Sequence, residues 1–265
     1  MISRPIAVAT LKQWLSSPLI WIAVAIVFVF ALGTAVFGIV LLRLPEFQAL
    51  SANSGATFAI ILGTGIIGRD LSSGVLPLVF ARPISRAKYV FSKWLTLSLT
   101  ALSLALAQCV LIHLFSLLVS PDTFSQAAFL YACVDALLVC FGFAAVMVLF
   151  SALKSGTFAG TGIWLLCLLV VAIMLQYGAR QPAEVPANMA GPSALAVNLL
   201  NGLIPLAGSV GSFLLSFFAN KSSIAEIYQN AVNWLSVTTY LSNLALALAL
   251  AVYVMNRREL TYASD

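Results

Sequence analysis

Charge is scarce in this sequence. Only 8% of its 265 residues are charged, while 62% are hydrophobic. Soluble globular chains carry about 25% charged residues. So few charges cannot cover the surface of a soluble protein of this length, which excludes an ordinary soluble domain. Lipid is therefore predicted to be the solvent for most of the chain.

Residues that build metal and catalytic sites are also few. The chain has one histidine, and its four cysteines lie in apolar runs without a CxxC pair. One histidine cannot form a multi-histidine metal site, and cysteines in apolar runs usually pack as small hydrophobic side chains. We therefore predict no metal site, no disulfide, no catalytic residue and no cofactor in this chain. The net charge of +5 does not by itself indicate nucleic-acid binding, because in a membrane protein the location of the charges matters.

Long hydrophobic runs, by contrast, are abundant. A run of about 20 apolar residues marks a transmembrane helix. Six such runs predict an all-α polytopic membrane protein with a single transmembrane domain over 1–265, and the first run is too long for a signal peptide. The predicted spans are 19–42, 53–68, 93–119, 126–152, 157–178 and 232–255.

Two further segments are apolar but not predicted to span. Residues 2–17 place Trp14 and Leu15 beside Lys12, which predicts an amphipathic helix at the membrane interface. Residues 179–231 contain several prolines, Pro205 among them, and predict short helices that lie at or dip into the outer face. A seventh span in 179–231 is the alternative, but it would move the basic C-terminus to the outside.

The basic residues set the orientation. With both termini on one side, that side holds ten Lys and Arg residues, and the opposite side holds Arg43, Arg180 and Lys221. Positive charge collects on the cytoplasmic side of membrane proteins. We therefore expect both termini, the 69–92 loop and Lys154 to be cytoplasmic, in a protein of the cell membrane.

The stretch "GTGIIG" at 63–68 matches the G-x-G-x-x-G pattern of a dinucleotide-binding turn. That turn requires a preceding strand and an acidic residue about 20 positions later. Here the pattern lies at the end of a predicted transmembrane span rather than after a strand. About 20 positions later, at 86–88, the chain reads Arg-Ala-Lys and so has no acidic residue. These glycines are better interpreted as points where another helix approaches closely.

Residues 69–93 read "RDLSSGVLPLVFARPISRAKYVFSK" and form the one substantial cytoplasmic loop. Leu71, Val75, Leu76 and Val79 recur at helical spacing, and Pro83 then ends the pattern. This predicts a short helix parallel to the membrane, which a soluble partner can push.

This loop resembles the permease subunits of type-2 class ABC transporters. Their loop between the second and third spans commonly reads as an acid, three spacers, Gly, an apolar run, "RPISR" and a later Lys. Asp70, Gly74 and Lys93 occupy those positions here, although the family often has Glu at the first and Thr where Val75 stands. The N-terminal "LKQWLSSP" and the tail "NRREL" are also similar to the family.

The resemblance implies docking of this loop on a separate ATPase subunit that holds ATP and magnesium. It also implies a second permease copy, most simply a homodimer, and alternating access by an exporter. Lys88 and Lys93 are expected to be ordinary anchors near lipid headgroups. The residues implied in coupling are Asp70, Leu71, Gly74, Val75, Leu76, Arg82, Pro83 and Arg86.

Two ionisable residues are predicted to lie within spans. Charged groups in a bilayer are costly and often functional. His113 and Asp135 are therefore candidates for a pair, or for a translocation pathway lined by Asp135. The alternative is local satisfaction of each side chain by Gln108, a hydroxyl or a backbone carbonyl.

Two other functions stay open. The chain can instead transmit force to an external or periplasmic protein that docks on 179–231, or it can form a stand-alone channel. The 179–231 segment is otherwise interpreted as a lid over the outer mouth of a pore. Copurification of an ATPase distinguishes the channel from the other two functions.

Overall fold

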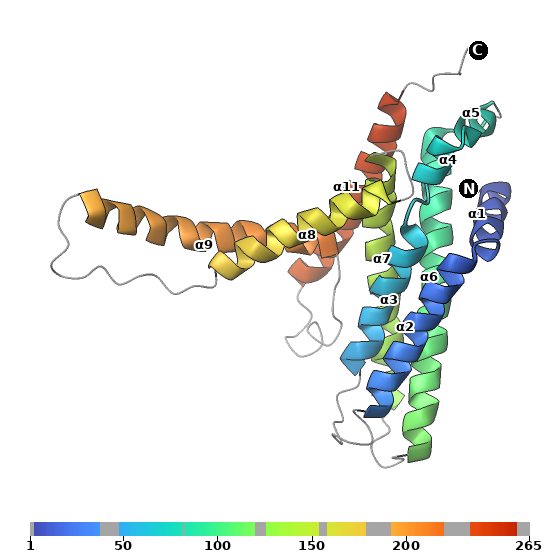
Figure 1. Cartoon of the computed structure of the whole chain (residues 1–265), viewed down its shortest axis with the longest axis horizontal. Coiled ribbons are helices and arrows are strands. Elements are labelled where there is room, and N and C mark those ends of the chain that lie inside the picture. The colour runs from blue at the N-terminus through green and yellow to red at the C-terminus, as the bar shows by residue number, and fades with distance from the viewer. Residues whose placement is uncertain are drawn as a thin grey trace.

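The computed structural model describes residues 3–37, 48–81, 83–119, 126–153, 158–178, 192–219 and 234–258. The regular elements within these ranges are α-helices, as the sequence predicts (Figure 1). They are α1 (Arg4–Leu15), α2 (Pro18–Phe37), α3 (Gln48–Gly63), α4 (Gly68–Ser72), α5 (Val75–Phe80), α6 (Arg86–Val119), α7 (Gln126–Leu153), α8 (Ala159–Gly178), α9 (Pro192–Ala219) and α11 (Trp234–Arg257). Arg43, Lys154, Arg180 and Lys221, which the orientation uses, lie outside the described residues.

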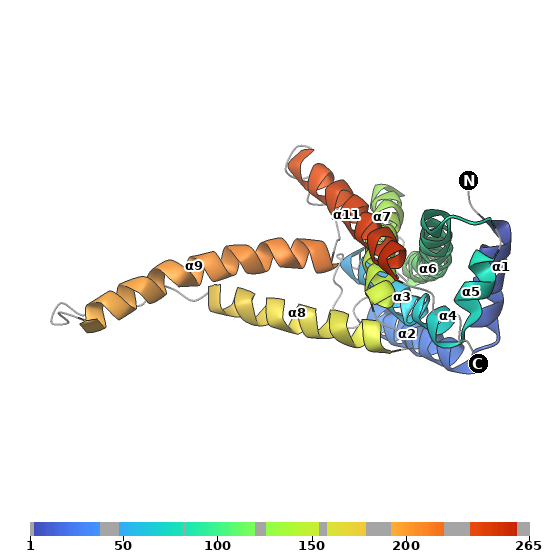
Figure 2. The ribbon, with the colours of Figure 1, turned by 90° about the horizontal axis from the view of Figure 1, so that it is seen from above.

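Helix α7 forms the centre of the bundle. It packs against α3, α6, α8 and α11, and its C-terminal half is buried without interruption from Gly142 to Ala152. A helix that is apolar on every side belongs in the interior of a bundle. Helices α3 and α6 run beside it, and α2 packs against α3 and α6 (Figures 1 and 2).

Small residues set the spacing between α3 and α7. A Cβ atom at Gly63 would lie 2.8 Å from the Cβ of Met147, and one at Gly55 would lie 2.9 Å from Sγ of Cys140. Helices in membranes approach closely where glycine faces the neighbouring helix. The close approach expected at the first glycine of "GTGIIG" is confirmed at Gly63.

Some of the described helices can cross a membrane. Arg86–Phe115, Phe129–Leu153 and Val237–Arg257 are long and apolar enough, and the pair α1 and α2 meets the same test as a helix bent by 76°. The chain is thus an integral membrane protein, while the count of six spans stays a prediction. The largest boundary shifts are in α6, which begins at Arg86 rather than 93, and in α3, which runs from Gln48 to Gly63 rather than from 53 to 68.

The region after α8 differs from the prediction of short helices. Helix α9 is continuous over 28 residues with Pro205 inside it, so that prediction is wrong. Proline removes one backbone hydrogen bond, but in apolar surroundings a continuous helix satisfies the remaining backbone groups better than several short ones. Helices α8 and α9 lie side by side and run across the direction of α6 and α7 (Figure 1).

The start of α8 presses on α7 at one glycine. A Cβ atom at Gly160 would meet the backbone carbonyl of Phe150 and lie 3.0 Å from the Cα of Ser151. Because backbone cannot move aside as a side chain can, we expect Gly160→Ala to destabilise the protein by about 1–3 kcal/mol. Thermal unfolding in detergent measures the effect.

Gly162 provides the matched control two residues along the same helix. Nothing lies within 4 Å of a Cβ atom at that position. Gly162→Ala is therefore expected to be neutral or to stabilise by up to about 1 kcal/mol through helix propensity. Equal unfolding midpoints for the two variants would contradict the described contact between α7 and α8.

Candidate functional site

The "GTGIIG" stretch is a turn between two helices. Gly63 ends α3, Gly65 adopts a φ of 69°, and Gly68 begins α4. The Oγ atom of Ser151 on α7 accepts hydrogen bonds from the backbone N–H of Ile67 at 2.9 Å and of Gly68 at 3.1 Å. A helix precedes this turn, and a serine from α7 occupies the N–H groups at the start of α4. The arrangement is that of a structural turn between α3 and the loop.

The amphipathic pattern of the loop forms two short helices rather than one. Gly74 separates α4 from α5 and adopts a φ of 67°, a left-handed conformation that glycine reaches at little cost. Leu76 on α5 is fully buried, whereas Val75 and Leu78 are exposed. The break at Gly74 thus turns one face of α5 into the core and presents the other to solvent.

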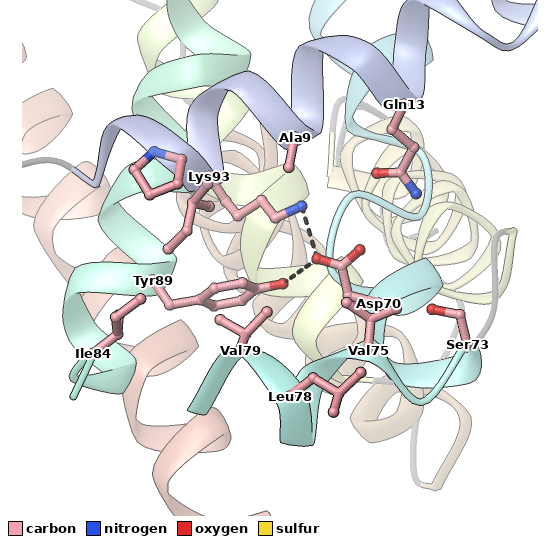
Figure 3. Close-up of a pocket in the computed structure, with 12 residues that line it drawn as sticks. Ala9, Gln13, Asp70, Ser73, Val75, Leu78, Val79, Ile84, Tyr89 and Lys93 are labelled. Atoms are coloured by element: carbon pink, nitrogen blue, oxygen red, sulfur yellow. Dashed lines mark hydrogen bonds and ion pairs between the residues drawn. The ribbon is translucent and has the colours of Figure 1, made fainter. Parts of the chain in front are cut away.

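Asp70 lies at the centre of the site. Its Oδ2 atom accepts a hydrogen bond from the Tyr89 hydroxyl at 2.6 Å and lies 2.8 Å from Nζ of Lys93 (Figure 3). The side chain of Lys93 is 3% exposed, that of Asp70 is 14% exposed, and Tyr89 is buried. Tyr89 and Lys93 are four residues apart and therefore share one face of α6. Two residues of α6 thus hold the carboxylate of α4.

The expectation that Lys93 anchors to lipid headgroups is wrong. Its side chain is buried and ion-paired. A buried lysine requires such a partner, because desolvation of an unpaired charge is very unfavourable. The acid and the lysine of the resembled motif are therefore one ion pair, which joins the beginning of the loop to α6.

A cavity of about 430 Å³ lies between α1, the loop and α6. Its walls include Ile6 and Gln13 of α1, Ser73 and Leu78 of the loop, and the ion pair (Figure 3). The backbone N–H of Ser3, which precedes α1, donates to Oγ of Ser92 on α6 at 3.1 Å. Helix α1 is thus fixed to α6 beside the loop.

Arginines connect the end of the loop to the C-terminal part of the chain. Nη1 of Arg86 donates to the carbonyl oxygens of Met255 at 2.6 Å, Asn256 at 2.8 Å and Arg258 at 3.0 Å. The guanidinium of Arg86 also lies 5.8 Å from the ring centre of Phe80 on α5. Positive charge at a helix C-terminus satisfies its open carbonyl groups and opposes its dipole.

The same region holds a second arginine contact. Arg258 donates from Nη2 to the carbonyl oxygen of Leu153, the last residue of α7, at 2.7 Å.

The remaining residues that the resemblance implies in coupling lie in different surroundings. Leu71 and Val79 pack against the buried core, and Pro83 is exposed. Of the residues implied in coupling, Arg82 lies outside the described residues.

The predicted pathway residues lie far from this site. Nδ1 of His113 is 2.9 Å from the carbonyl oxygen of Cys109 on its own helix, and its ring packs edge-on against Phe129 of α7 at 4.7 Å. Asp135 follows Phe129 by six residues, about 9 Å of helical rise. His113 thus has a backbone carbonyl of its own helix as a partner, which is the local satisfaction given as the alternative to a pair with Asp135. A role of these residues in a pathway stays a prediction.

Sequence reasoning missed two residues of the site. Tyr89 is recognisable by its spacing of four from Lys93, but only once α6 is known to begin at Arg86. Ser151 gives no local signal, because it lies 84 residues from Ile67 along the chain.

A bundle of apolar helices with an ion-paired polar loop at one end defines a polytopic integral membrane protein. A family model described as "ABC-2 family transporter protein" matches residues 46–260. The chain therefore belongs to the ABC-2 transporter family, as the loop motif indicates. No curated protein sequence matches the chain.

Membership of this family establishes the chain as a membrane permease of an ABC transporter. Such a permease is the transmembrane subunit and does not itself carry the catalytic activity. The family also implies association with an ABC ATPase.

Proposed function

We propose that this permease is the membrane-spanning subunit of an ATP-driven exporter. The proposal includes the six spans predicted from the sequence, with both termini in the cytoplasm of the cell membrane. Helices α2, α3, α6, α7 and α11 correspond to five of these spans. Helix α8, the sixth, runs across α6 and α7 in the described conformation and crosses the bilayer only after turning towards their direction. Two copies of the chain enclose the pathway. A separate ATPase binds ATP and magnesium and docks on the 69–92 segment.

The observation that carries this proposal is the attachment of the 69–92 segment to several helices at once. Asp70 joins it to α6, Ser151 joins α7 to Ile67 and Gly68 directly before it, and Arg86 joins α6 to the end of α11. A displacement of the segment is therefore passed to several membrane helices together. Rigid-body movement of this kind is how closure of a soluble motor reaches a membrane domain.

The face of α5 that would meet the ATPase is apolar. Leu78 is 71% exposed and Val75 is also exposed, although Leu76 between them is buried. Exposed apolar side chains beside polar residues are typical of protein interaction surfaces. These two side chains are the proposed contact.

Leu78→Asp is expected to abolish copurification of the ATPase and ATP-driven transport. The reason is that a desolvated, unpaired charge at an apolar contact costs several kcal/mol. The permease itself is expected to keep its thermal stability, because Leu78 is exposed. Ser16→Asp, which adds the same charge at an exposed position after α1, is the control and should leave copurification unchanged. ATPase binding by Leu78→Asp at the wild-type level would contradict the docking proposal.

Force transmission to an external protein is the second candidate. Leu199, Leu203, Leu206, Val210 and Phe213 recur at helical spacing on α9 and are exposed, so one face of this helix is apolar. Such a face fits either lipid or an external partner. Capture of one stable external protein, together with no flux in vesicles that hold an active ATPase, would favour this candidate over export.

A further inference from the structure

Gln108 is a buried polar residue in the middle of α6. Its side chain is 0% exposed, and it lies within the part of α6 that can span the membrane, Arg86–Phe115. Neither Nε2 nor Oε1 has a hydrogen-bond partner among the residues that the structure describes. Buried side-chain amides almost always have such partners, so each exception requires a physical explanation.

Three other polar side chains in the middle of α6 are satisfied within the helix. Thr96, Ser98 and Thr100 each donate a hydrogen bond to the carbonyl oxygen four residues earlier, at 2.7, 2.9 and 2.8 Å. A hydroxyl can make this bond inside a bilayer without help from another helix. Gln108 differs from them, because its amide requires partners that the described part of the chain does not supply.

The position of Gln108 relates it to the candidate pathway. A Cβ atom at Gly55 would touch both Ala105 of α6 and Cys140 of α7, and His113 contacts Phe129. Because α6 and α7 run antiparallel, these two contacts place Gln108 at the level of Asp135. Two polar side chains, one on each helix, therefore lie at a similar depth in the bundle.

We propose that Gln108 lines a water-filled translocation pathway in another conformation of the transporter, and that the described conformation is the closed one. In the closed packing the amide is dehydrated and unbonded, which disfavours that state. Separation of α6 from its neighbours hydrates the amide and removes this penalty. Gln108 is thus a polar group that biases the equilibrium towards opening. This inference rests on the proposed transport function.

Gln108→Met tests the bias. Methionine has a similar length without polar atoms, so it fills the closed packing without the dehydration penalty. We expect a higher unfolding midpoint together with ATP hydrolysis by the permease–ATPase complex that is slower by about fivefold or more. Ser98→Ala, at an equally buried but internally bonded position, is the control and should not slow hydrolysis. Wild-type hydrolysis by Gln108→Met, or an unchanged midpoint, would overturn the inference.

Thiol accessibility gives a second and independent measurement. Gln108→Cys is introduced after the four native cysteines are replaced by alanine, and the complex is treated with a membrane-impermeant maleimide. We expect labelling that rises at least about fivefold during ATP turnover, while Ser98→Cys stays unlabelled. Equal labelling with and without ATP, or none in either state, would overturn the inference even if Gln108→Met fails to fold.

Measurements on the wild-type complex distinguish a failure of the proposed transport function from a failure of the inference about Gln108. If wild-type permease does not change the ATP hydrolysis rate of its partner, the proposed function fails. If it does change that rate and Gln108→Cys is never labelled, only the inference about Gln108 fails.

Discussion

Lys93→Met is expected to destabilise the folded protein by about 3–5 kcal/mol, because it leaves the partly buried Asp70 carboxylate without its cation. The ion pair joins α4 to α6 at 2.8 Å with Lys93 only 3% exposed. Loss of the lysine therefore releases the loop that the ATPase is proposed to push. The measurements are thermal unfolding of the purified permease and ATP-driven transport by the complex, and both are expected to fall.

Two control variants make this prediction specific. Asp70→Asn combined with Lys93→Met removes both charges and is expected to recover most of the lost stability, since a neutral amide and an apolar side chain carry no unpaired charge. Lys88→Met removes a cation from the same helix near Lys93, at a half-buried position, and should change stability by less than about 1 kcal/mol. Stability of Lys93→Met at the wild-type level would show that the ion pair does not hold the loop.

Arg86→Ala is expected to lower stability by about 2–4 kcal/mol and to uncouple transport from ATP hydrolysis. Arg86 donates to three carbonyl oxygens at the end of α11, and each hydrogen bond from a charged group contributes about 1.5–3 kcal/mol, with shared donors contributing less than the sum. Without the guanidinium those carbonyl groups lose their partner and α11 loses its link to the loop. The ratio of transported cargo to hydrolysed ATP measures the uncoupling.

Arg86→Lys and Arg257→Ala test the role of geometry. Lysine keeps the charge but is a compact point donor, so we expect Arg86→Lys to recover only part of the stability. Arg257 is exposed and contacts the ring of Tyr253 at 5.4 Å, and Arg257→Ala should cost about 0.5–1 kcal/mol without uncoupling. A coupling ratio that is equal in Arg86→Ala and Arg257→Ala would rule out a special role for Arg86.

The polar loop is the part of the site that the sequence predicts best. The spacing of its motif identifies Asp70, Gly74 and Arg86. These residues are predictable because an acid, a glycine at a helix break and a basic turn are local features, which depend on residues close together in the sequence. The role of Lys93 is not predictable in the same way. A charged residue lowers the hydropathy of its segment, so the predicted span begins only after the first turns of α6. Those first turns hold Tyr89 and Lys93, which follow Asp70 by 19 and 23 residues along the chain.

The helices around α8 show a different limit. Hydropathy predicts apolar helices there, and it does so correctly for α8. It carries no information on direction, because every apolar face looks alike until its neighbours are known. The path of α8 across the bundle therefore depends on contacts such as Gly160 against Phe150, which pair residues that only the folded chain brings together.

The double hydrogen bond from Ile67 and Gly68 to Ser151 has a consequence for biogenesis. A five-residue helix such as α4 is not stable by itself, and its N-terminal support comes from a helix that the ribosome makes 83 residues later. During synthesis α4 therefore lacks this support until α7 has been made. The docking site proposed for the ATPase is thus complete only once most of the membrane domain has been synthesised.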